Sequence, residues 1–427
     1  MKLEQDIKRL LRISLYQNAI FLILNNLVTA ILGFAFWVVV ARFYSEIEVG
    51  YSSAIISAIN FIALVGLLGL NRSMVRFLPT SDRPVELINS YFTVGALASL
   101  AVSLVFLGGV GLWSPAIKFV RDNAIFALTF VGTAIIYTLA VITNSVFVAK
   151  RKARFVLFTN TLGALLKIPL PIGFALVLHS FGIIASWMIS LIVVIVLAIL
   201  VFMPRIENKY KPFIMFRGAY IKQTWKYAGS SYIASLCYNA PVLLLPLLVL
   251  NVLGIESNAY FYVAWIIAGV LYSIPGSVSE SLFAESSYDP EKIGNNVSLS
   301  FKLIFLLLFP SLVILFLVGK WLLFSFGPDY STHSLSLLWI LGGTSVFIAV
   351  VRVYFALLRV ADKLLEMIVI ELIIAVLLLT TSYFILPLTG INGIGYTWLS
   401  IHALLALVLI FRMRRLVKES AGKQYPA

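Results

Sequence analysis

The sequence predicts an all-α integral membrane protein. We expect twelve transmembrane helices in two six-helix lobes, related by a pseudo-two-fold axis along the membrane normal. The prediction depends on the apolar composition, the spacing of the apolar stretches and a weak internal repeat. Hydrophobic residues make up 61% and charged residues 12% of the chain. Soluble domains are nearer half apolar and a quarter charged, so lipid must be the solvent for much of this protein.

Twelve apolar stretches follow one another, each long enough to cross the hydrocarbon core as a helix. They are too long and too continuously apolar for the strands of a membrane barrel. We expect the spans at about 14–41, 49–78, 86–112, 123–149, 154–178, 182–203, 223–250, 258–284, 296–319, 333–358, 364–386 and 393–411.

A basic segment separates the sixth span from the seventh. Residues 204–222 contain five Lys and Arg residues and a single acid, Glu207. We therefore expect an N-terminal lobe at 1–203 with helices 1–6, and a basic cytoplasmic connector at 204–222. A C-terminal lobe at 223–427 would hold helices 7–12 and a basic tail.

The two halves carry related segments in the same order and at a nearly constant offset. Glu48-Val-Gly-Tyr51 opens the second span, and Ser257-Asn-Ala-Tyr260 opens the eighth. Gly182–Trp187 and Gly393–Trp398 open the sixth and the twelfth. Because six is an even number of spans, the second copy keeps the orientation of the first, as in parallel-repeat transporters.

Lys and Arg are concentrated in alternate loops, in the N-terminal head, in the connector and in the tail. The positive-inside rule then predicts a multi-pass protein of the cell membrane with both termini in the cytoplasm. Most of the net charge of +14 is explained by this bias. We expect membrane lipids, and no nucleic acid, as partners.

The patterns of catalytic chemistry are missing from the sequence. No GxxxxGK[ST] loop occurs, and the three histidines lie far apart without an HExxH pattern. We therefore predict a non-enzyme without cofactor or metal. Glu46 and Glu48 could hold a metal in a membrane glycosyltransferase, but acids also favour the positive end of a helix. The short outer loops favour the second interpretation.

Three cations inside or at the end of spans are candidates for substrate binding, since ionisable groups are costly in hydrocarbon. Lys167 lies in the middle of span 5, close to Pro169 and Pro171, whose rings should bend the helix. Arg72 and Arg76 lie one turn apart at the inner end of span 2. Snorkelling to the headgroups is an equally good explanation of the two arginines.

Uncharged polar residues in the first helix of each lobe are further candidates. Asn25 and Asn26 lie in span 1, and Tyr238 and Asn239 lie in span 7. Amides and aromatic rings are the groups that a sugar-bearing substrate requires. Hydrogen bonds between helices would explain the same residues.

Two acids at the inner end of span 8 are candidates for a latch between the lobes. By the internal repeat, Glu285 occupies the place of Arg76, and Glu280 lies close to it in sequence. Opposite charges at equivalent positions suggest that they attract each other. We also expect Arg352 in span 10 and Glu371 in span 11 to form a structural ion pair.

Several segments together resemble one superfamily. They are EVGYSSA at 48–54, GLLGLNRSMVRFLP at 66–79 and GINGIGYTW at 390–398, set within the six-plus-six repeat. The chain resembles polysaccharide exporters of the multidrug/oligosaccharidyl-lipid/polysaccharide (MOP) superfamily. The most similar type is the O-antigen-type lipid-linked oligosaccharide flippase.

The resemblance implies a V-shaped bundle that opens alternately to the two sides of the membrane. It implies export of a polyprenyl- or dolichyl-(pyro)phosphate-linked oligosaccharide for surface polysaccharide synthesis, with other polysaccharide-assembly proteins as partners. A cationic cavity is typical of such proteins and agrees with Lys167, Arg72 and Arg76.

Two other functions stay open at this point. The first is a cation-coupled multidrug-type antiporter, and the second, less favoured, is a membrane glycosyltransferase or polymerase. The drug exporters often carry an acid in span 1, whereas this chain has none between Asp6 and Glu46. The peptidoglycan-precursor flippase type usually has two further spans, which the sequence lacks.

Overall fold

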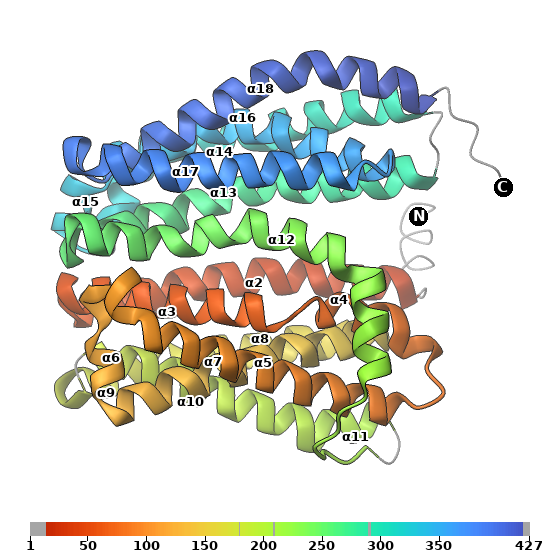
Figure 1. Ribbon diagram of the computed structural model, residues 1–427. Helices are drawn as coiled ribbons and strands as arrows, with labels where there is room; N and C mark the ends of the chain where they lie inside the picture. Colours follow the sequence, from red (N-terminus) through yellow and green to blue (C-terminus); the bar gives the residue numbers. More distant parts are fainter. Residues whose placement is uncertain (1–13, 179, 208–209, 289–291, 422–427) are drawn as a thin grey trace, which may run out of the picture. The chain divides into compact units, whose positions relative to one another are not determined.

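The structure, a computed structural model, describes residues 14–178, 180–207, 210–288 and 292–421. Within these ranges all regular elements are helical. Twelve of the helical segments there are long and apolar enough to cross a membrane. The predicted all-α protein with twelve spans is therefore confirmed (Figure 1).

The chain divides into two compact units, one ending at Tyr232 and the other beginning at Ile233. Unit 1 contains α2 (Ser14–Phe43), α3 (Glu46–Gly66), α4 (Leu70–Phe77), η1 (Leu78–Thr80), α5 (Pro84–Trp113), η2 (Pro115–Ile117), α6 (Phe119–Asp122), α7 (Ala124–Ala149), α8 (Ala153–Lys167), α9 (Leu170–Leu178), α10 (Ser180–Leu197), the π-helical turn η3 (Ala198–Phe202) and α11 (Met203–Ile206). Unit 2 contains α13 (Ile255–Tyr288), α14 (Ile293–Phe324), α15 (Pro328–His333), α16 (Leu335–Val360), α17 (Leu364–Thr389) and α18 (Asn392–Ala421). The helix α12 (Gly218–Leu253) begins in unit 1 and ends in unit 2.

The second span is broken, so the prediction of one helix over 49–78 is wrong. α3 ends at Gly66, and the backbone turns through the left-handed region at Leu68 and Gly69, with φ of 48° and 78°. Glycine tolerates this conformation because it has no Cβ. The short helix α4 that follows buries Leu70 and Met74 completely in the core of unit 1.

The fifth span is also interrupted, as the prolines predicted. α8 ends at Lys167 and α9 begins at Leu170, so that Pro169 lies in the gap between the two helices. Proline has no N–H to donate and its ring clashes with the preceding turn, which ends the first helix here. Lys167 is therefore the last residue of α8, at a break inside the span.

The core of unit 1 forms around α3, which is buried over most of its length. Its start is fixed by a capping box: the Ser45 Oγ accepts from the Glu48 N–H at 3.3 Å, and the Glu48 carboxylate accepts from the Ser45 N–H at 2.9 Å. This geometry supports the helix-terminus interpretation of Glu48. At the other end, a Cβ on Gly66 would lie 2.1 Å from the Ser99 Oγ, so the helices approach closely there.

In unit 2, α16 is the central helix. Most of its residues are buried, and α13 and α18 pack along it. Small residues allow close approach where α16 meets α14 and α18, since a Cβ on Gly342 would lie 2.4 Å from Leu315 of α14 and one on Gly395 of α18 would lie 2.9 Å from Leu337. α16 is therefore held in a fixed position, and it carries Arg352 into the interior of the unit.

Candidate functional site

The connector is bound to unit 1 by a polar stripe on α5. The stripe has helical spacing and consists of Glu86, Asn89, Ser90 and Thr93. We call residues 210–217, which have no regular secondary structure, the strap. The Asn89 Nδ2 donates to the Lys211 carbonyl at 2.9 Å, and the Met215 N–H donates to the Thr93 Oγ1 at 3.0 Å. The strap is thus attached to a helix of unit 1 at both of its ends.

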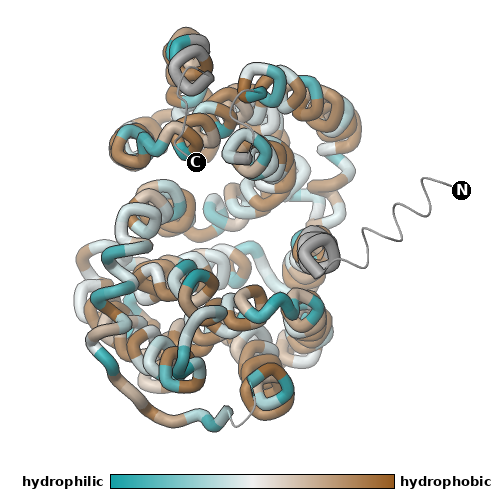
Figure 2. Tube along the Cα trace, turned by 90° about the vertical axis from the view of Figure 1, so that its right-hand side faces the viewer, coloured by the Kyte–Doolittle hydropathy of each residue, from teal (hydrophilic) through white to brown (hydrophobic). Residues whose placement is uncertain are grey.

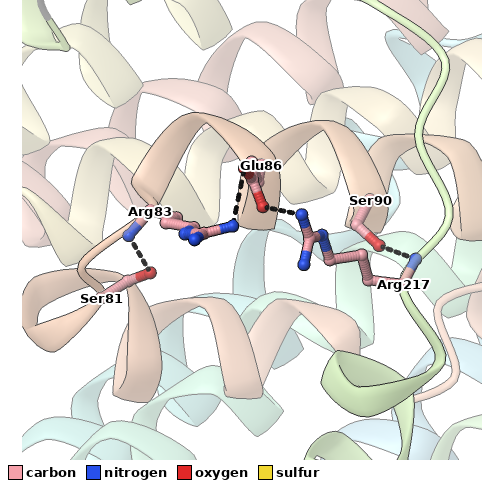
Figure 3. Close-up of polar contacts among 5 residues, drawn as sticks. All are labelled: Ser81, Arg83, Glu86, Ser90 and Arg217. Atoms are coloured by element: carbon pink, nitrogen blue, oxygen red, sulfur yellow. Dashed lines mark hydrogen bonds and ion pairs between the residues drawn. The ribbon is translucent and has the colours of Figure 1, made fainter.

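Figure 3 shows the end of the strap that leads into α12. Glu86 lies between two arginines, 2.8 Å from the Nη2 of Arg217 and 3.4 Å from the Nη1 of Arg83. The Arg217 N–H also donates to the Ser90 Oγ at 3.1 Å. One carboxylate therefore holds both the start of α5 and the end of the strap.

The other end of the strap is held by a buried tyrosine and an ion pair. Tyr210 is 4% exposed, and its hydroxyl donates to the Asn89 Oδ1 at 3.4 Å. Burial raises the pKa of Tyr210 to about 12, so the phenol stays neutral. Just before the strap, the carboxylate of Glu207 pairs with the Lys150 Nζ at 2.6 Å.

The first turns of α12 continue this attachment to unit 1 (Figure 1). The Tyr91 and Thr224 hydroxyls lie 2.7 Å apart, and the Tyr232 hydroxyl donates to the Val65 carbonyl at 2.7 Å. Arg72 donates to the Ser231 carbonyl at 2.9 Å. One of the two predicted arginines therefore binds the backbone of α12, while Arg76 is exposed on α4.

A chain of amides joins three helices in unit 1. The Asn144 Nδ2 of α7 donates to the Asn160 Oδ1 of α8 at 3.1 Å, and the Asn160 Nδ2 donates to the Asn25 Oδ1 of α2 at 2.9 Å. Asn25 is 8% exposed, whereas its neighbour Asn26 is exposed and accepts from the Asn25 Nδ2 at 3.4 Å. The chain of amides therefore runs from the interior of unit 1 to an exposed face of α2.

Lys167 lies on the same face of α8 as Asn160, two helical turns further along. Its ammonium is 4.8 Å from the centre of the Phe36 ring of α2, a cation–π contact. Among the described residues no carboxylate pairs with Lys167. Unit 1 thus has a half-buried cation without an acidic partner, roughly 10 Å along the helix from the amides.

Unit 2 has a cavity of about 20 Å³ with ionisable groups in its wall. Its polar lining comes from five helices and consists of Cys237 and Tyr238 of α12, Tyr272 of α13, Arg352 of α16, Glu371 of α17, and Trp398 and His402 of α18. The Arg352 guanidinium lies over the Tyr238 ring, 3.9 Å from its centre. The predicted site residue Tyr238 therefore contacts a half-buried cation. The Asn239 Nδ2 donates to the Ser235 carbonyl within its own helix at 2.8 Å.

The expected ion pair between Arg352 and Glu371 is not formed directly. Both residues line the same cavity, and Arg352 is close enough to act electrostatically on Glu371. Among the described residues, however, Glu371 has no ion pair or hydrogen bond. The Tyr238 ring holds the guanidinium in another position. The cavity has room for a water molecule, which could bridge the two charges.

The latch candidates have different surroundings. Glu280 forms an ion pair with Arg359 inside unit 2, with both carboxylate oxygens about 3 Å from the Arg359 Nη1. Glu285 is exposed on α13, and Arg76 is exposed on α4 of unit 1. The pairing of Arg76 with Glu285 stays a prediction.

Sequence reasoning missed several of these residues. Asn144 and Asn160 lie in different spans, and only the packing of α7, α8 and α2 brings them together. The polar stripe on α5 could have been predicted from the sequence, because its spacing of three and four residues within an apolar helix places the polar side chains on one face.

The fold that emerges is that of a membrane protein with six spans in each half. No protein-family profile and no curated protein sequence matches the chain. Solved structures do match it, at identities that establish the fold alone. The lipid II flippase MurJ in an inward closed conformation has a TM-score of 0.74 at 13% identity, covering 94% of this chain and 90% of that one.

Multidrug transporters match nearly as well. The inward-facing form of a MATE family transporter of the MOP superfamily has a TM-score of 0.71 at 14% identity, covering 93% of this chain and 96% of that one. An outward-facing form has a TM-score of 0.66 at 15% identity, covering 97% and 99%. The chain therefore shares its fold with MOP superfamily transporters, as the sequence resemblance implied.

Proposed function

We propose that this protein is a flippase that moves a polyprenyl- or dolichyl-(pyro)phosphate-linked oligosaccharide across the cell membrane for surface polysaccharide synthesis. The observation that carries the proposal is Lys167, a cation inside a span that has an aromatic contact and, among the described residues, no acidic partner. Intramembrane charges of this kind mark substrate pathways. The likeness to the lipid II flippase MurJ, whose substrate is also carried on a lipid, adds support.

The chemistry of such a substrate fits the face shared by α2 and α8. A sugar diphosphate cannot enter hydrocarbon unless its charges and hydroxyls find partners. Lys167 would bind the phosphate as a point charge. Asn25, Asn26 and Asn160 would exchange hydrogen bonds with the sugar hydroxyls, since amides both donate and accept. Alternating access of the two units would then move the headgroup without breaking a bond.

Arg72 and Arg76 have separate roles in this proposal. Arg76 is exposed and would receive the diphosphate on the cytoplasmic side. Arg72 donates to the Ser231 carbonyl, so it would position α12 for substrate binding. Tyr238 and Asn239 would contact the glycan from the second unit.

A cation-coupled multidrug antiporter is the second candidate, because MATE transporters share the fold. α2 of this chain carries no acid, which argues against coupling through the first helix. Efflux of a cationic dye from cells that express the protein would favour this candidate.

The proposal is tested by complementation of glycan export in a flippase-null strain. Lys167→Ala should reduce export roughly ten- to hundredfold, the value of a charge-assisted hydrogen bond of about 1.5–3 kcal/mol. Lys167→Arg should retain part of the export because the charge is kept. Membrane levels of each variant are measured by immunoblot.

Lys118→Ala is the matched control, since Lys118 is an exposed lysine between α5 and α7. It should export normally. Full export by Lys167→Ala at normal expression would remove Lys167 from the site and leave the arginines as the only proposed phosphate ligands.

We also place both termini and the connector in the cytoplasm. Single cysteines in a variant without Cys237 test this orientation. A cysteine at Thr389 should react with an impermeant reagent from outside the cell, and one at Lys211 should react only after permeabilisation. Labelling of Lys211 from outside, with Thr389 labelled only after permeabilisation, would reverse the proposed orientation.

A further inference from the structure

A groove about 310 Å³ in volume lies between the strap and unit 1. α5 lines it with Asn89, Phe92, Thr93 and Ala96, α7 with Leu139, and the strap with Pro212, Phe213 and Ile214. Apart from the amide and the hydroxyl that hold the strap, the lining is apolar. From Asn89 to Ala96 the groove follows α5 for roughly 10 Å.

The middle of the strap is apolar although it belongs to a polar connector. In Figure 2 the strap crosses the lower left of the molecule as an extended chain and turns brown in its middle. Phe213 is 48%, Ile214 91% and Phe216 69% exposed. The hydrogen bonds to Asn89 and Thr93 hold the backbone against α5, so these side chains cannot withdraw into unit 1. Their position suits the boundary between headgroups and hydrocarbon.

The basic residues around the strap differ in whether an acidic side chain pairs with them. Arg217 pairs with Glu86, and Lys150 pairs with Glu207. Lys211, next to the groove, is exposed and has no ion pair with any described residue. Lys222, in the first turn of α12, is exposed in the same way. An excess of positive charge thus lies beside an apolar groove, which is the combination that binds anionic lipids.

We propose that the groove behind the strap is a binding site for an anionic phospholipid. One acyl chain lies against Phe92, Ala96 and Leu139, and the headgroup phosphate pairs with Lys211. Phe213 and Ile214 cover the chain from the outside. A bound lipid ties the strap more firmly to α5, so that it moves with unit 1. The site lies apart from Lys167 and the amides, and it does not depend on the proposed transport function.

The test is native mass spectrometry of the purified full-length protein. Phosphatidylglycerol and phosphatidylcholine with identical acyl chains are added in turn, and the lipid retained per protein is measured. The wild type should retain phosphatidylglycerol preferentially. Lys211→Gln should lower this preference about fivefold, the effect of one lysine near an anionic surface. Ala96→Phe, which fills the groove, should lower the retention of both lipids.

Each variant has a matched control. Lys118→Gln removes an exposed lysine from another part of unit 1, and Leu97→Phe enlarges the exposed neighbour of Ala96 outside the groove. Both should bind lipid as the wild type does. Leu139→Trp fills the same groove from α7 and replaces Ala96→Phe if that variant fails to fold.

Three results would overturn the proposal. Equal retention by Ala96→Phe and Leu97→Phe would show that the groove holds no acyl chain. An unchanged preference for phosphatidylglycerol in Lys211→Gln would show that Lys211 does not bind the lipid headgroup. A protein dimer that Ala96→Phe abolishes would make the groove an interface between copies of the chain.

Discussion

The two units differ in the partners of the charged side chains inside their spans. In unit 1, α2 and α8 present neutral amides and one cation, Lys167, which contacts an aromatic ring and pairs with no acid among the described residues. In unit 2, Arg352 and Glu371 line one cavity and lie close enough to act on each other electrostatically, without a direct ion pair. A cation with no acid nearby has capacity for an anionic ligand, whereas a cation close to a carboxylate is already partly compensated. We therefore assign substrate binding to the face of α2 and α8 and a structural role to the charges of unit 2.

The strongest test of this difference is the loss of one charge in unit 2. Arg352→Met should lower the free energy of unfolding by about 3 kcal/mol, because Glu371 is left as a buried charge without compensation. The double variant Arg352→Met with Glu371→Leu should recover most of the loss. Unfolding of the purified variants in detergent gives the coupling energy through a double-mutant cycle. Additive effects would show that the two charges do not compensate each other.

The matching substitution in unit 1 should reduce glycan export more than it reduces the free energy of unfolding. Lys167→Met removes a cation–π contact worth about 0.5–1 kcal/mol and leaves no described acid unpaired. The free energy of unfolding should therefore change by less than that of Arg352→Met, while glycan export falls. Export and unfolding are measured on the same two variants. A loss of stability as large as that of Arg352→Met would make Lys167 a structural residue.

A smaller effect is expected at the amides. Asn160→Leu removes hydrogen bonds to Asn25 and from Asn144, and should lower the free energy of unfolding by about 1 kcal/mol, since such bonds in membranes average near 0.6 kcal/mol. Thr380→Val is the control, because the Thr380 hydroxyl is exposed and donates within its own helix. If Asn160→Leu is as stable as the wild type but exports no glycan, the amides serve the substrate alone.

The smallest effect concerns the proposed latch. The pair of Arg76 and Glu285 would be worth at most about 1 kcal/mol, because both side chains are exposed. Arg76→Glu and Glu285→Arg should each reduce export, and the double variant should export more than either single variant, although the proposed contact of Arg76 with the diphosphate stays lost. Export that stays low in the double variant would reject the pairing. Glu280, which is bound to Arg359, should not replace Glu285 in this exchange.

The spans could be predicted from the sequence because hydropathy over about twenty residues depends on composition and not on packing partners. The break of span 5 was equally predictable, since Pro169 acts on its own backbone. The break of span 2 was missed although Gly69 is a visible signal. Its cause includes the left-handed Leu68, which is held in place by the packing of α4 and not by its own preference.

The candidate site was less accessible to sequence reasoning. Lys167 and Asn25 could be chosen because each is unusual in an apolar stretch. The residues around them could not be predicted, since Phe36, Asn144 and Asn160 approach them only through the packing of separate helices. The same limit applies to Arg352 and Glu371, whose direct pairing was expected from charge alone, whereas the Tyr238 ring holds the guanidinium.

The attachment of the strap to α5 has a consequence for biosynthesis. Asn89, Ser90 and Thr93 form hydrogen bonds with the strap, and the Val65 carbonyl accepts from Tyr232. These partners follow the sixth span, which ends at Ile206, in the sequence. Because domains fold as they emerge during synthesis, unit 1 must wait for the start of the seventh span before it closes. A ribosome stalled after the sixth span would hold a half whose α5 stripe is still open to chaperones and proteases.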